Sequence, residues 1–205
     1  MKKTALIAIA ILILIFTVSL PSFGQTVDWS KKALQSERSR SYDALHYLIR
    51  IKLDLDQKAF EGSTTVTASS LREGLETCVL DAEEFTVTSV FSDDGLPLKF
   101  AQTAKELAVH LPRLYKFGEE FSFTCIYNGR DPKIGLRFMP ETADNPQLVF
   151  SDSFPENVHH WFPCYDYPND KVTDEVIATV KSGLKVAANG RLVSAIEDKA
   201  AGTVT

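Results

Sequence analysis

Nine residues decide the fold of this chain: Tyr47-Leu48-Ile49-Arg50-Ile51-Lys52-Leu53-Asp54-Leu55. Every second side chain is apolar, and most of the residues between them are charged. Successive side chains of a β-strand point to opposite faces, so this alternation predicts a strand with one buried face. The period of two begins at Tyr42, and we expect the folded domain to start there.

Short strand-like segments follow along the rest of the chain. A turn at 56–58 leads into a returning strand at 60–69. Further strands are predicted at 77–80, 85–91, 106–111, 121–127, 175–180 and 191–196. Asp93-Asp94-Gly95 and Asn189-Gly190 are turn signals. No sustained helical period occurs after residue 24, so we predict an all-β domain, an antiparallel sandwich or curved sheet.

The first 24 residues have the features of a signal peptide. Lys2 and Lys3 precede an uncharged, mostly apolar run at 4–20, and small residues end at Gly24. This pattern predicts export, with cleavage before Gln25. The alternative is a membrane anchor formed by residues 4–20. Residues 25–41 are polar and predict a surface leader.

Charge and cysteine content narrow the functional classes. Loss of Lys2 and Lys3 would change the net charge from −5 to −7, and the mature chain has no basic cluster. We therefore expect no nucleic-acid partner. The three cysteines, Cys78, Cys125 and Cys164, match no disulfide framework. Cys78 and Cys125 lie in apolar runs and are interpreted as small buried side chains, with a bridge as the alternative.

A second stretch reads Trp161-Phe162-Pro163-Cys164-Tyr165-Asp166-Tyr167-Pro168-Asn169-Asp170-Lys171. The closely spaced Pro163 and Pro168 exclude a helix or a central strand, so we expect a rigid loop. Its aromatic side chains must then dock against the domain. We predict that Trp161 and Phe162 are largely buried and anchor the loop to the sheet.

The polar residues of this loop are expected to support it rather than to react. A carboxylate at Asp166 can accept backbone N–H groups, and Lys171 could pair with it or with a neighbouring element. Cys164 lies near Asp166, which would raise the pKa of the thiol and lower its reactivity. The sequence has no G-x-S-x-G motif and no Cys/His signature, so we assign no catalytic residue.

The histidines do not form a recognisable metal motif. They are His46, His110, His159 and His160. None belongs to an H-E-x-x-H sequence, the helical zinc motif of metallopeptidases. The side chains of His159 and His160 should diverge in an extended segment, and a site with Cys164 or Asp166 would fit no common zinc spacing. We expect ordinary loop histidines, and neither metal nor cofactor in this chain.

The loop at 161–171 closely resembles the W-F-P-x-x-D-x-P-x-D-K signature of the aminopeptidase N family, the gluzincin zinc aminopeptidases. Four other motifs follow that family's pattern in order: Tyr42-Asp43-Ala44-Leu45-His46-Tyr47, Phe60-Glu61-Gly62 with Thr64 and Val66, Gly135-Leu136-Arg137-Phe138, and Val186-Ala187-Ala188-Asn189-Gly190-Arg191-Leu192. The resemblance runs from about Tyr42 to the C-terminus.

The resemblance implies that 42–205 is a saddle-like N-terminal β domain. Such a domain flanks a zinc-containing catalytic domain, absent here, and shapes the pocket for the α-amine of a peptide. Phe154 stands where many members have an amine-binding Glu, so Asp152, Phe154 and Glu156 are candidate residues of the substrate cleft. The implied partners are the missing catalytic domain and peptide substrates, and the implied reaction is removal of N-terminal residues.

The last residues, 202–205, are strand-like and have no stop feature, so we expect a fragment of a longer product. The alternative function is a non-enzymatic exported β-sandwich that binds a protein or peptide through the aromatic loop. The DNA sequence beyond codon 205 would distinguish the two, because a peptidase requires a downstream H-E-x-x-H motif.

Overall fold

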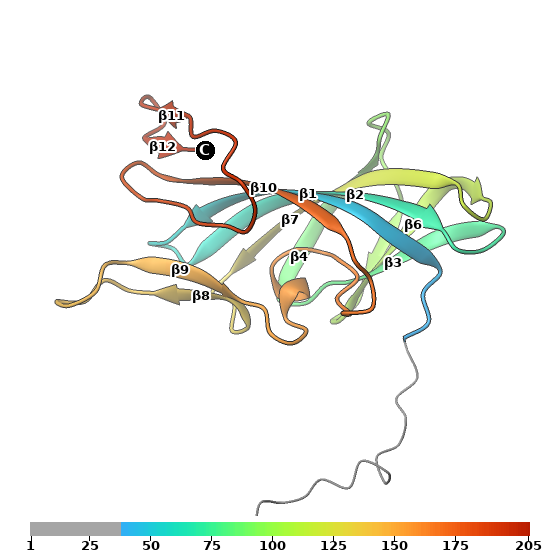
Figure 1. Ribbon diagram of the computed structural model, residues 1–205, viewed down its shortest axis with the longest axis horizontal. Coiled ribbons are helices and arrows are strands. Elements are labelled where there is room, and N and C mark those ends of the chain that lie inside the picture. The colour runs from blue at the N-terminus through green and yellow to red at the C-terminus, as the bar shows by residue number, and fades with distance from the viewer. Residues whose placement is uncertain (1–37) are drawn as a thin grey trace, which may run out of the picture. The chain divides into compact units, whose positions relative to one another are not determined.

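A computed structural model describes residues 38–205, which form β-strands, one 3-10 turn and no α-helix (Figure 1). The strands are β1 (Tyr42–Asp54), β2 (Ala59–Ser70), β3 (Leu75–Asp81), β4 (Phe85–Ser92), β5 (Phe100–Gln102), β6 (Glu106–Tyr115), β7 (Glu120–Arg130), β8 (Gly135–Met139), β9 (Leu148–Asp152), β10 (Thr173–Lys181), β11 (Glu197–Asp198) and β12 (Thr203–Val204). The 3-10 turn η2 is Val158–His160. The prediction of an all-β domain is confirmed. The signal peptide predicted at 1–24 and most of the leader lie outside the described residues.

The largest sheet has seven strands in the order β11-β12-β10-β1-β2-β7-β4. The pairs β1–β2, β2–β7 and β7–β4 are antiparallel. Strand β10 lies parallel to β1, with Ile49 opposite Val176. The prediction of an antiparallel sheet is therefore wrong for this pair of strands. Parallel pairing needs a long connection, and the whole chain between β1 and β10 supplies it.

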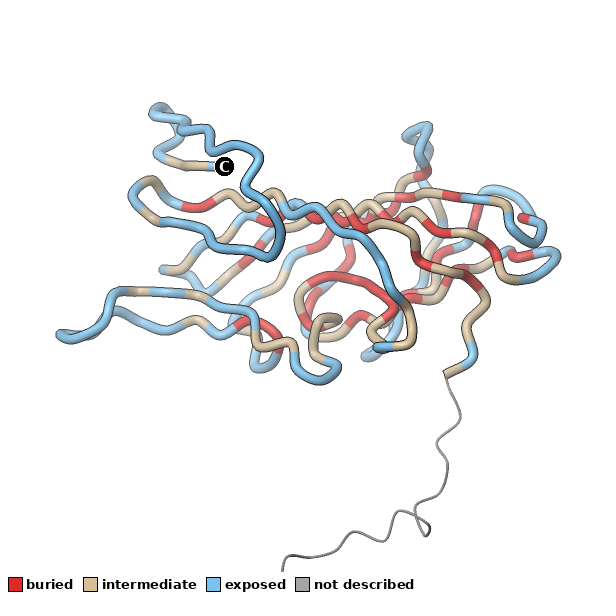
Figure 2. Tube along the Cα trace, in the orientation of Figure 1, coloured by how far each residue is buried: buried red, intermediate tan, exposed pale blue. Residues whose placement is uncertain are grey.

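Two smaller sheets complete the described domain: β3-β6-β5 and the hairpin β8-β9. Apolar side chains of β1, β2, β4 and β7 form one buried cluster with those of β3 and β6, as the distribution of buried residues shows (Figure 2). Tyr47, Ile49 and Ile51 enter this core at 2–5% exposure, as the alternation predicts. Leu53 and Leu55 are half-buried, because β1 leaves the core near its end.

The segment after β10 differs from the prediction. Residues 191–196 form no strand, so the turn signal at Asn189-Gly190 does not join two strands in the described chain. Gly190 does adopt a positive φ of 88°, so the chain bends there. Val186, Leu192 and Val193 remain exposed, because no neighbouring strand pairs with this segment. The chain therefore turns at Asn189-Gly190, but no hydrogen-bonded pair of strands among residues 38–205 extends from this turn.

All three cysteines are buried and free, which confirms the interpretation of Cys78 and Cys125 as buried apolar side chains. Burial in an apolar environment raises the pKa of each of these two thiols. Among residues 38–205, no helix has both the length and the hydropathy that crossing a bilayer would require.

Candidate functional site

The aromatic loop, residues 161–171, lies in the connection between β9 and β10 and is docked on the end of β3 by backbone hydrogen bonds. Asp81 N donates to Cys164 O at 2.7 Å, and Cys164 N donates back to Asp81 O at 3.2 Å. Glu83 N donates to His159 O at 3.0 Å. The loop thus adds a short bridge to the small sheet. This bridge brings the acidic segment at 81–84 next to the two loop histidines.

Aromatic packing holds the other side of the loop. Phe162 is 6% exposed and packs edge-on against Tyr47, with ring centroids 5.8 Å apart. The buried Tyr165 contacts Tyr42 in the same way at 6.2 Å, and Tyr165 N donates to Tyr47 Oη at 3.0 Å. Trp161 is half-buried and packs on Phe162. These rings therefore belong to the core and do not form an exposed binding surface.

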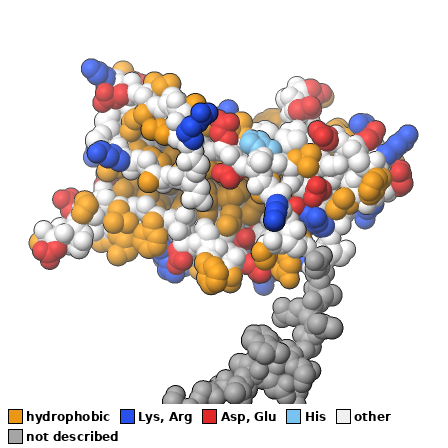
Figure 3. Space-filling model, in the orientation of Figure 1, with side chains coloured by type: hydrophobic (Ala, Val, Ile, Leu, Met, Phe, Trp, Pro, Cys, Tyr) orange, Lys and Arg blue, Asp and Glu red, His pale blue; other side chains and the backbone are white. Residues whose placement is uncertain are grey.

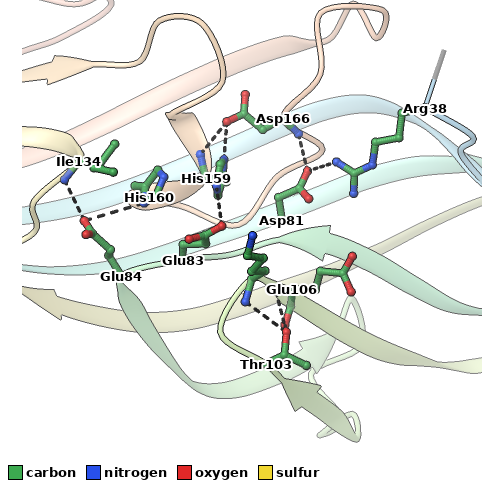
Figure 4. Close-up of polar contacts among 11 residues, drawn as sticks. Arg38, Asp81, Glu83, Glu84, Thr103, Glu106, Ile134, His159, His160 and Asp166 are labelled. Carbon is green, nitrogen blue, oxygen red and sulfur yellow. Dashed lines mark hydrogen bonds and ion pairs between the residues drawn. The ribbon is translucent and has the colours of Figure 1, made fainter. Parts of the chain in front are cut away.

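Carboxylates fix the shape of the loop. Asp166 Oδ2 accepts a hydrogen bond from His159 N at 3.2 Å. The backbone N–H of Asp166 donates to Asp81 Oδ2 at 2.9 Å, and Arg38 Nη1 donates to the same oxygen at 2.6 Å. A guanidinium, two carboxylates and a backbone amide thus form one connected network (Figure 4).

Asp170 has a role that the sequence analysis missed. Its Oδ2 accepts a hydrogen bond from Ala44 N at 3.1 Å, and its Oδ1 forms an ion pair with Arg40. Lys171 is exposed and forms no ion pair among the described residues. The position of Asp170 in the loop motif is the only sequence signal for this role, because its partners lie at the start of β1.

The two histidines do not diverge, contrary to the sequence-based expectation. They lie in the 3-10 turn rather than in an extended segment, and their ring centroids are 4.3 Å apart. His159 Nδ1 lies 2.6 Å from Asp166 Oδ2, and its Nε2 lies 3.4 Å from Glu83 Oε1. His160 is 6% exposed, with its Nδ1 3.8 Å from Glu84 Oε2. A carboxylate therefore faces each imidazole.

The environments of these imidazoles shift their pKa values in opposite directions. The hydrogen bond that His159 Nδ1 donates to the Asp166 carboxylate raises the pKa of His159 above its ordinary value. Burial lowers the pKa of His160, and the neighbouring His159 lowers it further. The pair therefore combines one imidazole that favours the protonated form with one that favours the neutral form.

Glu84 and Gly135 connect this cluster to the β8-β9 hairpin. Glu84 Oε2 accepts the backbone N–H groups of Lys133 at 2.8 Å and Ile134 at 2.9 Å. Gly135 has a φ of 77°, and a Cβ there would lie 2.8 Å from the Cβ of His160. The backbone of β8 thus approaches the histidine turn closely, which explains why glycine occupies this position.

The cleft candidates lie at the start of the same connection. Asp152 ends β9, and its Oδ2 is 3.5 Å from Arg137 Nη2 across the hairpin. Phe154 is 86% exposed, and Glu156 is also exposed. Their side chains stand at the surface, away from the buried rings of Phe162 and Tyr165.

Comparison with known proteins places this arrangement in a family. Residues 43–204 match the Peptidase M1 N-terminal domain. The M1 zinc metallopeptidase of Deinococcus radiodurans has a similar structure, with a TM-score of 0.69 and 27% identity over 81% of this chain. A mutant of that enzyme with a bound Tyr-Ser-Ala substrate is equally similar, at 27% identity over 80% of the chain. Native yeast LTA4 hydrolase shares the fold, with a TM-score of 0.64 and 20% identity over 85% of the chain.

The chain spans 38% of the length of the Deinococcus enzyme and 29% of the yeast hydrolase. A search of curated proteins gave no match. The family match covers nearly the whole described domain, including β1, the β8-β9 hairpin and the aromatic loop. The chain therefore belongs to the Peptidase M1 N-terminal domain family.

Proposed function

We propose that this chain is the N-terminal domain of an exported zinc aminopeptidase and that it shapes the substrate side of the catalytic cleft. The observation that carries this proposal is the family match over residues 43–204. It is supported by the similarity to a zinc metallopeptidase that has been captured with a bound Tyr-Ser-Ala substrate. The chain spans 38% of the length of that relative. The proposed activity is therefore that of a longer protein to which this domain would belong.

An exposed apolar surface supports packing against a further domain. Met139, Leu148 and Phe150 of the β8-β9 hairpin are 39–49% exposed, and Leu192 and Val193 are 80% and 83% exposed. Figure 3 shows apolar side chains gathered over β8 and β9. Exposed apolar side chains gathered on one element are typical of interfaces. We assign it to the catalytic domain of the parent peptidase.

The division of labour follows from the residues that this sequence lacks. Without H-E-x-x-H, the chain does not supply the zinc ligands and general base that such peptidases use to activate water. The catalytic domain would supply both. Asp152, Phe154 and Glu156 would face the substrate and contribute orientation rather than chemistry. The burial of Phe162 and Tyr165 argues against the alternative in which the aromatic loop binds a protein or peptide.

Activity measurements test this function. The full-length protein encoded by the gene should hydrolyse aminoacyl substrates in a zinc-dependent manner, whereas the 205-residue chain should not. The control is the full-length protein with its H-E-x-x-H glutamate replaced by Gln. An open reading frame without a downstream catalytic domain would contradict the proposal, as would peptidase activity of the 205-residue chain.

Export has a separate test. Residues 1–24 should be removed during secretion, because a positive start precedes an apolar run and a small residue at the cleavage site. N-terminal sequencing of the exported protein should begin at Gln25. A mature protein that retains Met1 would favour the membrane anchor at residues 4–20 instead.

A further inference from the structure

Three side chains that can ligate a metal ion converge beside the aromatic loop. One oxygen of Glu83 and one nitrogen each of His159 and His160 lie within 4.8 Å of one another. Figure 4 shows the two imidazoles next to each other, with the Glu83 carboxylate close to His159. We propose that these three residues bind a divalent transition-metal ion of the zinc type. Two imidazoles and one carboxylate are an established donor set for zinc.

The orientation of His159 suits this role. Its Nδ1 is held by Asp166 Oδ2 at 2.6 Å, which directs Nε2 toward Glu83 Oε1 at 3.4 Å. A metal-ligating histidine commonly has its second nitrogen bound to a carboxylate in this way. Zinc–ligand bonds of about 2.0–2.1 Å place tetrahedral ligands roughly 3.3–3.4 Å apart. Glu83 and His159 therefore already have the separation of a ligand pair.

His160 supplies independent evidence, because it is buried and its polar atom is unsatisfied. Its side chain is 6% exposed, and its Nδ1 has no hydrogen-bond partner anywhere in residues 38–205. Glu84 Oε2, at 3.8 Å, is too distant for a hydrogen bond. Buried polar atoms are rarely left without a partner. A metal ion shared with His159 and Glu83 would bind one nitrogen of this buried imidazole.

The charge around the cluster also favours a cation. Carboxylates of Asp81, Glu83, Glu84 and Asp166 surround the histidine pair, and Arg38 pairs with one of them (Figure 4). Glu84 is engaged with backbone N–H groups, whereas Glu83 retains a side-chain exposure of 29%. A metal ion can therefore reach the Glu83 carboxylate from solvent. The alternative cation is a proton on His159, and zinc titration distinguishes it from a metal ion.

A metal ion in this position would join two segments that are distant in sequence. Glu83 precedes β4, whereas His159 and His160 belong to the turn before the aromatic loop. Sequence spacing could not indicate this site, because the carboxylate ligand comes from another part of the chain. Three protein ligands leave a fourth position for water. The ion would brace the loop against the end of β3.

Zinc titration of the purified 205-residue chain tests the site. The chain should be treated with a chelator, dialysed and titrated with ZnCl2 by calorimetry, and Co2+ absorption should report the coordination geometry. We expect one ion per chain, a tetrahedral Co2+ spectrum and a higher Tm in zinc. His160→Ala and the nearly isosteric Glu83→Gln should each weaken zinc binding at least tenfold. His110→Ala is the matched control, because His110 is an exposed histidine elsewhere on the domain.

Loss of a metal ligand can be distinguished from misfolding of the variant. Circular dichroism should show that Glu83→Gln retains the β-structure of the parent chain. Absence of saturable zinc binding by the parent chain would overturn the proposal and leave a proton as the cation of this cluster. Equal zinc affinity of the parent chain, Glu83→Gln and His110→Ala would also overturn it, because binding would then occur at adventitious surface sites.

Discussion

Single residues from distant parts of the chain hold the aromatic loop in place. The hydroxyl of Tyr47 accepts the buried N–H of Tyr165, and a carboxylate oxygen of Asp81 accepts the N–H of Asp166. Each unsatisfied buried polar group would cost about 1–3 kcal/mol. The phenol of Tyr47 is also deeply buried, and desolvation raises its pKa. It therefore remains a neutral hydrogen-bonding group at physiological pH.

Phe162→Ala should destabilise the domain more than any other truncation of a loop ring. Removing a buried Phe typically costs about 3–5 kcal/mol, because transfer free energy is lost and a cavity remains. Thermal or urea unfolding monitored by circular dichroism measures the change. Trp161→Ala should cost less, because Trp161 is only half-buried.

Phe154→Ala is the matched control, since Phe154 is 86% exposed. It should change the free energy of unfolding by no more than about 0.5 kcal/mol. Equal losses for Phe154→Ala and Phe162→Ala would show that the loop is not docked as described.

Gly135→Ala should be costly because of the close approach between β8 and the histidine turn. The new Cβ would meet the Cβ of His160 at 2.8 Å in addition to adopting a positive φ. Gly118 also has a positive φ, of 79°, but has open space around it, so Gly118→Ala reports the backbone cost alone. That cost is about 1–2 kcal/mol. Urea midpoints should show a larger loss for Gly135→Ala, and identical losses would exclude the steric conflict.

At the level of elements, the parallel pairing of β1 with β10 organises the site. The aromatic loop immediately precedes β10, so it must finish beside the start of β1. Asp170 secures this junction through Ala44 N and Arg40, and its side chain is 4% exposed. The loop is therefore fixed at both ends, by β3 near Cys164 and by β1 near Asp170.

Asp170→Ala should lower the free energy of unfolding by about 1–3 kcal/mol, because the Ala44 N–H and the Arg40 guanidinium both lose an acceptor. Lys171→Ala changes the adjacent, exposed residue and should stay within about 0.5 kcal/mol of the parent chain. Chemical denaturation of both variants provides the comparison. A larger loss of unfolding free energy for Lys171→Ala than for Asp170→Ala would contradict the structural role assigned to Asp170.

On the scale of the whole molecule, the domain presents two different surfaces near the β8-β9 hairpin. The exposed apolar side chains of the hairpin suit contact with a further domain, whereas Asp152, Phe154 and Glu156 begin the loop that leads to the histidine turn. In the proposed peptidase, the first surface would attach the domain and the second would face the substrate.

Replacement of Asp152, Phe154 or Glu156 by Ala in the full-length enzyme should alter kcat or KM on aminoacyl substrates. Bound catalytic zinc should remain unchanged, because none of the three would ligate it. Steady-state kinetics combined with metal analysis checks both expectations, with Glu73→Ala on the exposed turn between β2 and β3 as the control. Unchanged kinetics for all three variants would mean that this loop does not reach the active site.

Local patterns determined much of this protein. Apolar and mostly charged side chains alternate from Tyr47 to Leu55, and a strand places alternate side chains on opposite faces. The strand and its buried face were therefore predictable from the sequence. The same holds for most other strands, for the buried Cys78 and Cys125, and for the rigidity of a loop with two closely spaced prolines. The motif order in 42–205 was sufficient to indicate the family that the comparisons confirm.

Tertiary structure alone decided the parallel pairing of β1 with β10, the segment at 185–195 that joins no strand, and the polar cluster around His159 and His160. Each depends on contacts between residues far apart in the sequence, and no local period encodes such contacts. Glu83 faces His159 only because Asp81 and Cys164 form a bridge, and Asp170 reaches Ala44 only because β10 returns beside β1. The hydrophobic core holds the strands in the arrangement that brings these hydrogen-bonding and charged groups together, so the site exists only in the folded chain.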